Sequence, residues 1–442
     1  MMGAMDAIRA DTSTGTGPLA TRFHAMRALS HALAAPLSDA DATLQSMDDA
    51  SPAKWHLAHT TWFWETFLLR DHLPDYAPFD ARWAFLFNSY YEAEGPRHAR
   101  VARGMLARPS LDEIRGWRTH VDSAMAPLLE RDDLAALIEL GIAHEQQHQE
   151  LLLTDIKHAF AQNPLGPKIF AKNPNPARVE LGETTIATSL DFRDLGSEVC
   201  PERSRLAREE RCWWDHPGGI VRIGHSGADF AFDNEGPAHD VLLQSFALAT
   251  TLITNAEWAV FIAEGGYRNA ALWLSDGWAW VRREGVETPL YWRDDDWFTH
   301  GGWTTRDPLD PVTHISYYEA DAFAQWAGAR LPTEFEWEAV ATNLDPAEGN
   351  QLDHAGPIAP IGSADLFGGC WQWTRSAYLP YPRFRPAEGA VGEYNGKFMS
   401  GQFVLRGASC ATPRGSSRAT YRNFFYPHQR WQFTGLRLAK DI

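Results

Sequence analysis

Two histidines, His144 and His148, are four positions apart in the sequence HEQQHQE at residues 144–150. Four residues turn a helix by about 400°, so both imidazoles lie on one face, where they can bind the same metal ion. Three leucines follow directly, which indicates a buried helix whose polar side chains need partners. The pattern predicts two metal ligands, and Glu150 is a candidate to orient one of them. The alternative is a solvated polar face with incidental histidines.

A third ligand must come from another helix, and the segment WHLAH offers His56 and His59. Periodicity does not separate the two, because this segment is apolar almost all round. We favour His59, which lies deeper in the helix, and expect His56 to be a core or rim histidine that metal binding does not require. Three neutral imidazoles suit Fe(II) and Zn(II) alike.

The sequence FNSYYEAEGPRHARVAR, at residues 87–103, stands between these two helices. Paired tyrosines beside a metal site could donate a proton or a hydrogen bond to oxygen, which makes Tyr90 and Tyr91 candidate catalytic residues. Arg97, Arg100 and Arg103 recur every three residues and could bind carboxylates. The alternatives are loop aromatics that cap a bundle and a solvated charged loop.

Capping signals predict the helices that position these groups. Ser51-Pro52 is read as an N-cap and first helical residue, opening a helix that ends near Pro74. Ser110 and Glu113 form a capping box for a helix that ends near Leu129. Two further helices are predicted at 21–35 and 132–160, and together the four amphipathic segments indicate a bundle.

The composition and the predicted secondary structure change in the second half of the sequence. Residues 163–215 are rich in proline and charge, and from Gly218 onward short strand-like runs alternate with helix starts. Three of these starts carry capping boxes, at Thr254 and Glu257, Ser316 and Glu319, and Thr333 and Glu336. We therefore predict a flexible tail at 1–20, a helical domain at 21–162, a linker at 163–215 and an α+β domain at 216–442.

The composition limits the partners and the compartment. A formal charge of −17 argues against nucleic acid, whose phosphates need Lys and Arg. No apolar run approaches the ~20 residues of a membrane-spanning helix, and the N-terminus lacks a secretory signal, so a cytoplasmic protein is expected. The four cysteines have no C-x-x-C spacing, and free thiols are expected.

Several segments resemble known families. WHLAHTTWFWETF, NSYYEAEGPRHARVARG and HEQQHQELLLTDIKHAF resemble the DinB-like helical domain of the sulfoxide synthases of ergothioneine biosynthesis. PVTHISYYEADAFAQWAGARLPTEFEWEAVA, LFGGCWQWTRSAYLPYPRF and YRNFFYPHQRWQFTGLRLA resemble their formylglycine-generating-enzyme-like domain, a variant of the C-type lectin fold. The resemblance implies a DinB-like four-helix bundle followed by a C-type-lectin-like α+β domain, and it covers about residues 22–440 apart from the linker.

The resemblance also implies roles for individual residues. His59, His144 and His148 would bind Fe(II), with O₂ as co-substrate, and Tyr90 or Tyr91 would be the proton donor. The residues implied to bind substrate are Gln147 and, in the second domain, Asn423, Phe424 and Phe425. The aromatic faces of the last two suit a trimethylammonium group.

The activity implied is oxidative coupling of the imidazole of hercynine (trimethylhistidine) to the thiol of cysteine or γ-glutamylcysteine. One alternative is a DinB-type thiol transferase that needs no O₂, and another is a non-enzymatic lectin-like binding module. Ovothiol-type synthases act on histidine and commonly carry a methyltransferase; none is expected here, so hercynine is preferred. Formylglycine-generating enzymes bind copper through two cysteines, whereas RGASCATPRGSS offers only Cys410, so no separate redox chemistry is expected of this domain.

Overall fold

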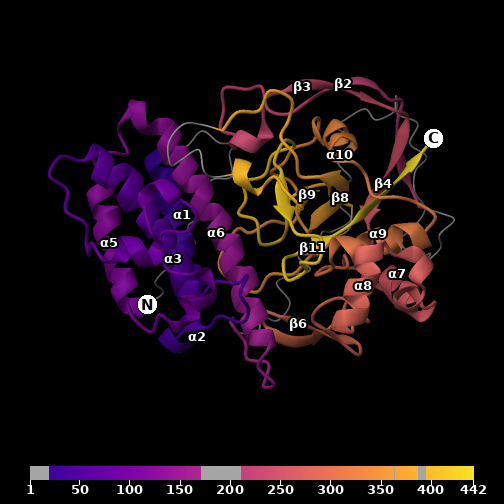
Figure 1. Cartoon of the computed structure of the whole chain (residues 1–442), viewed down its shortest axis with the longest axis horizontal. Coiled ribbons are helices and arrows are strands. Elements are labelled where there is room, and N and C mark those ends of the chain that lie inside the picture. The colour runs from indigo at the N-terminus through magenta and orange to yellow at the C-terminus, as the bar shows by residue number, and fades with distance from the viewer. Residues whose placement is uncertain (1–18, 171–210, 363, 387–394) are drawn as a thin grey trace, which may run out of the picture.

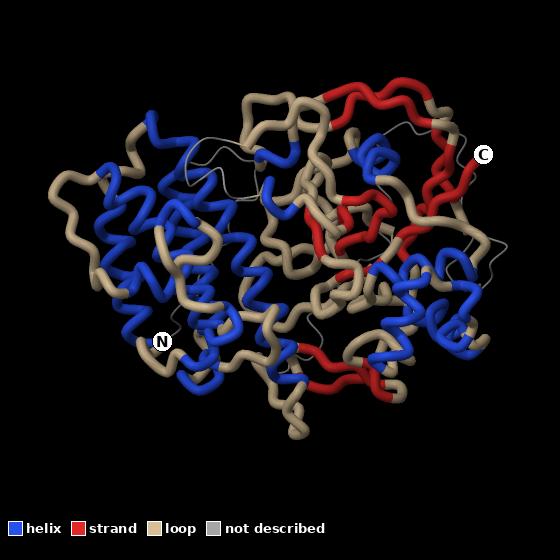
Figure 2. Tube along the Cα trace, in the orientation of Figure 1, coloured by secondary structure: helices blue, strands red, loops and turns tan. Residues whose placement is uncertain are grey.

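The computed structural model describes residues 19–170, 211–362, 364–386 and 395–442. An N-terminal helical domain lies beside a C-terminal domain of short strands and helices, which confirms the predicted multidomain α and α+β fold (Figures 1 and 2). The helix α6 runs along the boundary between the two domains (Figure 1). Most of the predicted tail and linker, and Cys200, fall outside the described residues.

The helical domain contains three helices of 15 or more residues and several shorter ones. Its helices are α1 (Leu19–Ala34), α2 (Asp39–Thr43), α3 (Ala53–Phe63), a π-helix (Trp64–Arg70), α4 (Trp83–Phe87), α5 (Leu111–Met125) and α6 (Ala135–Ala161). The capping box of Ser110 with Glu113 begins α5, as predicted. The reading of Ser51 as an N-cap is wrong, because Pro52 is the capping residue of α3 and makes no side-chain bond. Ser51 instead donates its backbone N–H to the carboxylate of Asp155, 2.7 Å away.

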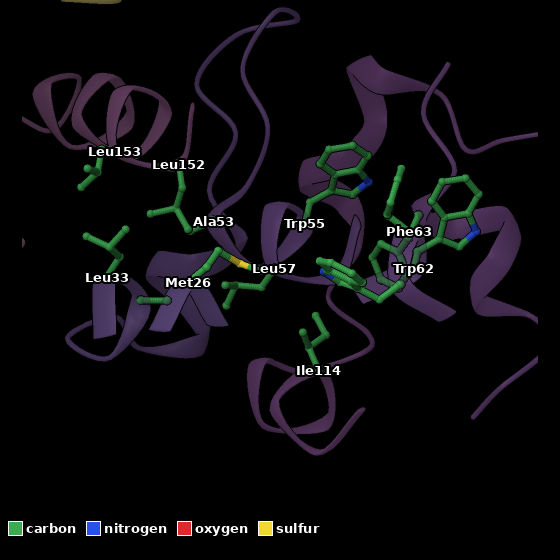
Figure 3. Packing of buried hydrophobic residues seen from close by; sticks show 14 of the residues in the cluster. Met26, Leu33, Ala53, Trp55, Leu57, Trp62, Phe63, Ile114, Leu152 and Leu153 are labelled. Atoms are coloured by element: carbon green, nitrogen blue, oxygen red, sulfur yellow. The ribbon is translucent and has the colours of Figure 1, made fainter. Parts of the chain in front are cut away.

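The core of the helical domain forms where α1, α3, α5 and α6 meet. All 11 residues of α3 are buried, which explains why its apolar pattern has no preferred face. Figure 3 shows Trp55, Leu57 and Trp62 of α3 among side chains from the neighbouring helices. A helix surrounded on every side can hold a histidine away from bulk water, so this core shields the candidate metal ligand of α3 from solvent.

A buried carboxylate joins three of these helices. Glu145 of α6 accepts hydrogen bonds from Arg27 of α1 and Arg118 of α5, each at 2.8 Å, and from Ser30 at 2.6 Å and the indole of Trp64 at 3.0 Å. These partners hold the pKa of Glu145 well below its usual range despite burial. Glu145 follows His144 directly, and this network fixes the rotation of α6 within the bundle.

The C-terminal domain contains small sheets surrounded by helices and loops. Its strands are β1 (Trp213–His216), β2 (Gly219–Ile223), β3 (His239–Leu243), β4 (Phe246–Leu252), β5 (Trp292–Arg293), β6 (Asp296–Thr299), β7 (Gly302–Thr305), β8 (Trp371–Ala377), β9 (Phe403–Arg406), β10 (Asn423–Phe425), β11 (Thr434–Gly435) and β12 (Arg437–Asp441). Its helices are α7 (Asn255–Ala263), α8 (Ser275–Glu284), α9 (Tyr317–Trp326) and α10 (Glu334–Ala341). The three predicted capping boxes begin α7, α9 and α10.

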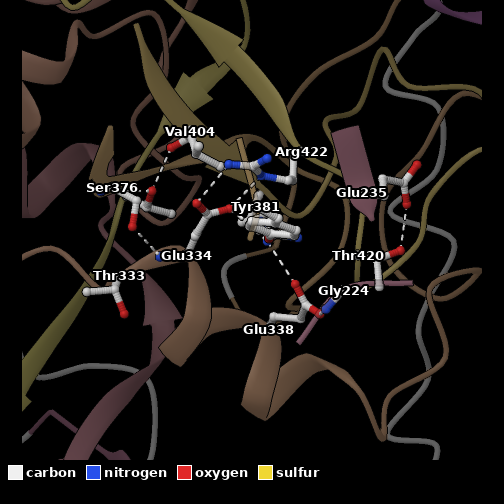
Figure 4. Close-up of polar contacts among 12 residues, drawn as sticks. Gly224, Glu235, Thr333, Glu334, Glu338, Ser376, Tyr381, Val404, Thr420 and Arg422 are labelled. Atoms are coloured by element: carbon white, nitrogen blue, oxygen red, sulfur yellow. Dashed lines mark hydrogen bonds and ion pairs between the residues drawn. The ribbon is translucent and has the colours of Figure 1, made fainter. Parts of the chain in front are cut away.

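The sheets pair in the orders β1-β4-β12, β10-β9-β8-β11, β2-β3 and β5-β6-β7. β10 pairs antiparallel with β9, which sets Phe424 opposite Val404. A buried cluster joins Glu334 of α10 to Arg422, at 2.8 Å (Figure 4), and to Arg406 of β9, at 3.0 Å. The cluster ties the segment before β10 to the domain core and so positions the aromatic residues of that strand.

The expectation of free thiols is correct for only part of the chain. Cys212 is disulfide-bonded, which contradicts it, whereas Cys370 and Cys410 are free and buried. Burial raises the pKa of Cys370 to about 12 and also raises that of Cys410, so both thiols are poor nucleophiles. None of the described helices is both long enough and apolar enough to cross a lipid bilayer.

The network around Glu145 gives a stability prediction. Glu145→Gln removes the negative charge and leaves Arg27 and Arg118 buried without it, so we expect unfolding in urea to become easier by about 3–5 kcal/mol. Far-UV circular dichroism would follow the transition. The matched control is Glu139→Gln, also on α6, whose pair with Arg22 is about one third exposed and should contribute less than ~1 kcal/mol. Equal losses in the two variants would contradict the account.

Candidate metal centre

Three histidines from two helices meet inside the helical domain. His59 comes from α3, and His144 and His148 come from α6. One ring nitrogen from each residue lies within 4.8 Å of the other two, so the three could hold one metal ion between them. Among the described residues, this is the single cluster of three or more such groups that could hold a metal.

Packing and a hydrogen bond fix the ring of His59. The imidazole stacks between Trp55 and Trp62, with centroid distances of 4.6 and 5.5 Å and interplanar angles of 12° and 13°. Its Nδ1–H donates to the carbonyl oxygen of Phe87 at 2.6 Å. That bond leaves Nε2 with its lone pair as the atom that can bind a metal.

The other two rings are held from different directions. His148 has Nδ1 within 2.9 Å of Nδ1 of His56, so Nε2 is again the atom left for a metal. The ring of His144 packs against Phe63 with centroids 4.7 Å apart. The centroids of the three candidate ligands are 4.7 to 5.0 Å apart, and their planes are steeply inclined to one another.

Burial keeps these imidazoles neutral. It lowers the pKa of His144 to about 3 and lowers those of His59 and His148 well below 6.5, with mutual repulsion of the rings as a further cause for the last two. A neutral imidazole has the lone pair that a metal ligand needs. All three side chains are buried and neutral, and His59 and His148 are also aligned by their other nitrogens, so the cluster fits a divalent metal such as Fe(II) or Zn(II).

The two glutamates of the HEQQHQE segment are bound by residues outside the metal cluster, unlike the glutamate of a zinc-protease helix, which serves the metal site. Glu145 is committed to Arg27 and Arg118. Glu150 does not orient His148 as expected, because its carboxylate accepts bonds from Trp371, Ser409 and Thr412 of the C-terminal domain, at 2.7, 2.6 and 2.8 Å. Periodicity could not reveal this, since the partner belongs to another domain.

Gln147 also reaches across the boundary. Its side-chain N–H donates to the hydroxyl of Tyr421 at 2.6 Å, and Tyr421 lies two residues before β10. The residue is therefore placed between the candidate ligands of α6 and the strand that carries Asn423, Phe424 and Phe425. This position is compatible with its expected contact with substrate, which stays a prediction.

The two tyrosines have different surroundings. Tyr91 is buried, and its ring packs 5.4 Å from Trp62, which stacks on His59, and 6.5 Å from Phe63, which packs on His144. Tyr90 is 36% exposed and accepts a hydrogen bond from Arg100 at 2.8 Å. Of the two tyrosines, Tyr91 is therefore the one that a single aromatic ring separates from each of two candidate ligands.

The three arginines do not act as one group. Arg97 pairs with Glu92 at the surface, and Arg100 contacts Tyr90 and the carbonyl oxygen of Asp49. Arg103 is buried, with its guanidinium 3.4 Å from the ring centroid of Trp55 and hydrogen bonds to Ser51 and Ser89. Burial lowers the pKa of Arg103 to about 9. Arg103 thus supports the indole that stacks on His59, a role that its sequence spacing did not indicate.

The expected substrate residues of the second domain lie among aromatic rings. Phe424 stacks on Tyr378 with centroids 4.1 Å apart, and Phe398 lies between it and Tyr90, at 6.0 and 4.9 Å. Phe425 lies 6.4 Å from Trp431. Asn423 begins β10, opposite Leu405. Tyr90 of the helical domain and Phe424 of the C-terminal domain thus belong to one row of rings across the boundary.

Comparison with known proteins agrees with this two-domain arrangement. Residues 22–152 match the DinB superfamily, and residues 214–352 and 353–442 match the Sulfatase-modifying factor enzyme 1-like domain. The chain is 31% identical to a hercynine oxygenase of Mycolicibacterium thermoresistibile, over 91% of this chain and 90% of the relative. The chain belongs to the hercynine oxygenase family.

Further members and more distant relatives support the assignment. A hercynine oxygenase of Mycobacterium tuberculosis is also 31% identical, over 97% of this chain and all of its own length. Ergothioneine biosynthesis protein 1 of Schizosaccharomyces pombe is 30% identical over 75% of the chain, which corresponds to 44% of that larger protein. The resemblance to ergothioneine-pathway enzymes drawn from the sequence is confirmed.

The cluster predicts which histidines the protein needs in order to bind metal. Alanine at His59, His144 or His148 should in each case abolish metal binding, because two imidazoles cannot replace three. Metal analysis of protein reconstituted with Fe(II) and desalted would give the stoichiometry. His158→Ala is the matched control, since His158 is on the same helix and contacts Ser46. Full iron content in any of the three ligand variants would contradict the assignment.

Proposed function

We propose that this hercynine oxygenase family member is an oxidoreductase that joins the imidazole carbon of hercynine to the sulfur of cysteine or γ-glutamylcysteine. One C–H and one S–H bond are lost and a C–S bond forms. One atom of O₂ becomes the sulfoxide oxygen, and the other leaves as water with the two hydrogens. The observation that carries the proposal is the buried cluster of three neutral imidazoles, in which Phe87 and His56 engage the second nitrogens of His59 and His148.

The donor set suits the proposed Fe(II) and leaves positions open. Three neutral imidazoles with no thiolate or carboxylate among them would give the ion weak charge compensation, so anionic substrate atoms can join. When bound there, Fe(II) would supply redox chemistry and coordination positions for thiolate, imidazole and O₂. His59, His144 and His148 would hold it.

The other residues are proposed to bind and orient the substrates. Gln147 would hydrogen-bond hercynine from the face of α6 that meets the C-terminal domain, where it now contacts Tyr421. Asn423 would bind the carboxylate, and Phe424 and Phe425 would offer aromatic faces to the trimethylammonium group. Arg97 and Arg100, which are both partly exposed, would bind the carboxylates of the thiol substrate, whereas Arg103 would act indirectly, through its contact with Trp55.

The family assignment favours this function over its alternatives. A thiol transferase would need the metal only to activate a thiol, and an ovothiol-type synthase would take histidine. The relatives named hercynine oxygenase match nearly the whole chain, which supports an oxygenase acting on the trimethylated substrate. The same proposal includes a cytoplasmic location, where the thiol substrate stays reduced.

Oxygen consumption tests the proposal directly. With Fe(II), hercynine and cysteine or γ-glutamylcysteine, we expect O₂ uptake and one coupled sulfoxide per O₂, identified by mass spectrometry. Omission of Fe(II), hercynine or thiol should abolish both. Histidine in place of hercynine tests the ovothiol-type alternative, and coupling under anaerobic conditions would establish thiol transfer instead.

Tyr91 is proposed to donate the proton that steers the reaction toward coupling. Proton transfer typically contributes 10²–10⁴-fold, or about 3–5 kcal/mol of barrier, which is enough to decide between competing products. Tyr91→Phe should keep iron but shift product from the coupled sulfoxide toward the sulfinate of the thiol. Tyr90→Phe is the comparison, because that phenol is bound by Arg100. An unchanged product ratio in Tyr91→Phe would exclude this role.

A further inference from the structure

The orientation of His148 depends on a residue that is not a candidate ligand. His148 and His56 face each other through their Nδ1 atoms at 2.9 Å. A hydrogen bond between two nitrogens requires one to carry the proton and the other to accept it. If Nδ1 of His148 accepted, its Nε2 would carry the proton of the neutral ring and could not bind a metal. Metal binding therefore needs an acceptor at Nδ1 of His56.

Asp155 makes Nδ1 of His56 a hydrogen-bond acceptor. Its Oδ2 lies 3.1 Å from Nε2 of His56, and a carboxylate can only accept, so Nε2 of His56 carries the proton. In the neutral ring Nδ1 of His56 is then an acceptor, and His148 must donate to it. The carboxylate thus selects the tautomers of two successive imidazoles and leaves the lone pair of His148 Nε2 for the metal.

The C-terminal domain holds the far end of this chain. The indole N–H of Trp431 donates to Oδ1 of Asp155 at 2.9 Å, and the backbone N–H of Ser51 donates to Oδ2 at 2.7 Å. His56, Asp155 and Trp431 are 3%, 4% and 7% exposed, so water does not compete strongly for these bonds. Removal of Trp431 would leave one carboxylate oxygen without this donor.

We propose that His56 and Asp155 are positioning residues for the metal ligand His148, and that Trp431 couples metal affinity in the helical domain to the docked C-terminal domain. The inference rests on the metal centre of the proposed function. It departs from the sequence-based expectation that His56 is dispensable for metal binding. Partners of this kind typically change metal affinity 10–100-fold when they are removed.

Co(II) is a suitable probe, because its visible absorption reports the number and geometry of its ligands in the absence of turnover. Dissociation constants of the full-length protein would be measured by competition with a chelator. His56→Leu removes both bonds of the imidazole, and Asp155→Asn keeps the size of the side chain but places an NH₂ group against a donor. His56→Gln keeps one acceptor and one donor and serves as the rescue. Trp431→Phe removes only the indole donor.

We expect His56→Leu and Asp155→Asn to weaken Co(II) binding about 10–100-fold with an altered spectrum. His56→Gln should recover most of the affinity, and Trp431→Phe should weaken it several-fold. Trp373→Phe is the matched control, since Trp373 is buried in the same domain and donates to the carbonyl oxygen of Ile315, and should not change it.

Wild-type affinity and spectrum in His56→Leu, or in Asp155→Asn if the leucine variant does not fold, would overturn the positioning role. Equal effects of Trp431→Phe and Trp373→Phe would overturn the coupling between domains. The two proposals fail separately. Wild-type protein that binds Co(II) as expected but couples no hercynine with Fe(II) would refute the function and leave this inference standing, whereas normal coupling with unchanged affinity in the variants would refute the inference alone.

Discussion

The structure depends on how α6 satisfies the polar side chains that it buries on several faces. Glu145 faces the arginines of α1 and α5, and His144 and His148 face α3. Glu150 and Asp155 accept hydrogen bonds from the C-terminal domain. A buried polar group without a partner would cost several kcal/mol in an apolar setting, so each of these pairings constrains the rotation and depth of the helix. The same constraint that stabilises α6 therefore aims its two imidazoles.

The position of α6 also explains how both domains would contribute to the proposed site. Gln147, between the candidate ligands, contacts Tyr421, and Glu150 contacts the segment around Cys410. The row of rings from Tyr90 through Phe398 to Phe424 crosses the same boundary. In the proposed function the helical domain would hold the metal, and the strand β10 would bring the groups that recognise the quaternary ammonium of hercynine. Neither domain alone offers both.

The features that could be predicted from the sequence are those that depend on short-range patterns. Four-residue spacing gave the pair on α6, and capping boxes gave the starts of α5, α7, α9 and α10, because each depends on neighbours within one turn. Contacts between distant segments were missed. Nothing in the spacing of Glu150 indicates that it binds Trp371, and nothing near His56 indicates Asp155, 99 positions away. The roles implied by resemblance for Gln147, Asn423, Phe424 and Phe425 rest on the family, and for Gln147 also on its contact with Tyr421 across the boundary.

The location of the metal tests the account most directly. Crystals of the Fe(II)-loaded protein, measured at the iron absorption edge, would give an anomalous-difference map that shows iron alone. The account predicts one strong peak among the ring nitrogens of His59, His144 and His148, with His56 hydrogen-bonded to His148 and outside the coordination sphere. A peak bound by His56 and Asp155, or one in the C-terminal domain beside Cys370 and Cys410, would contradict it.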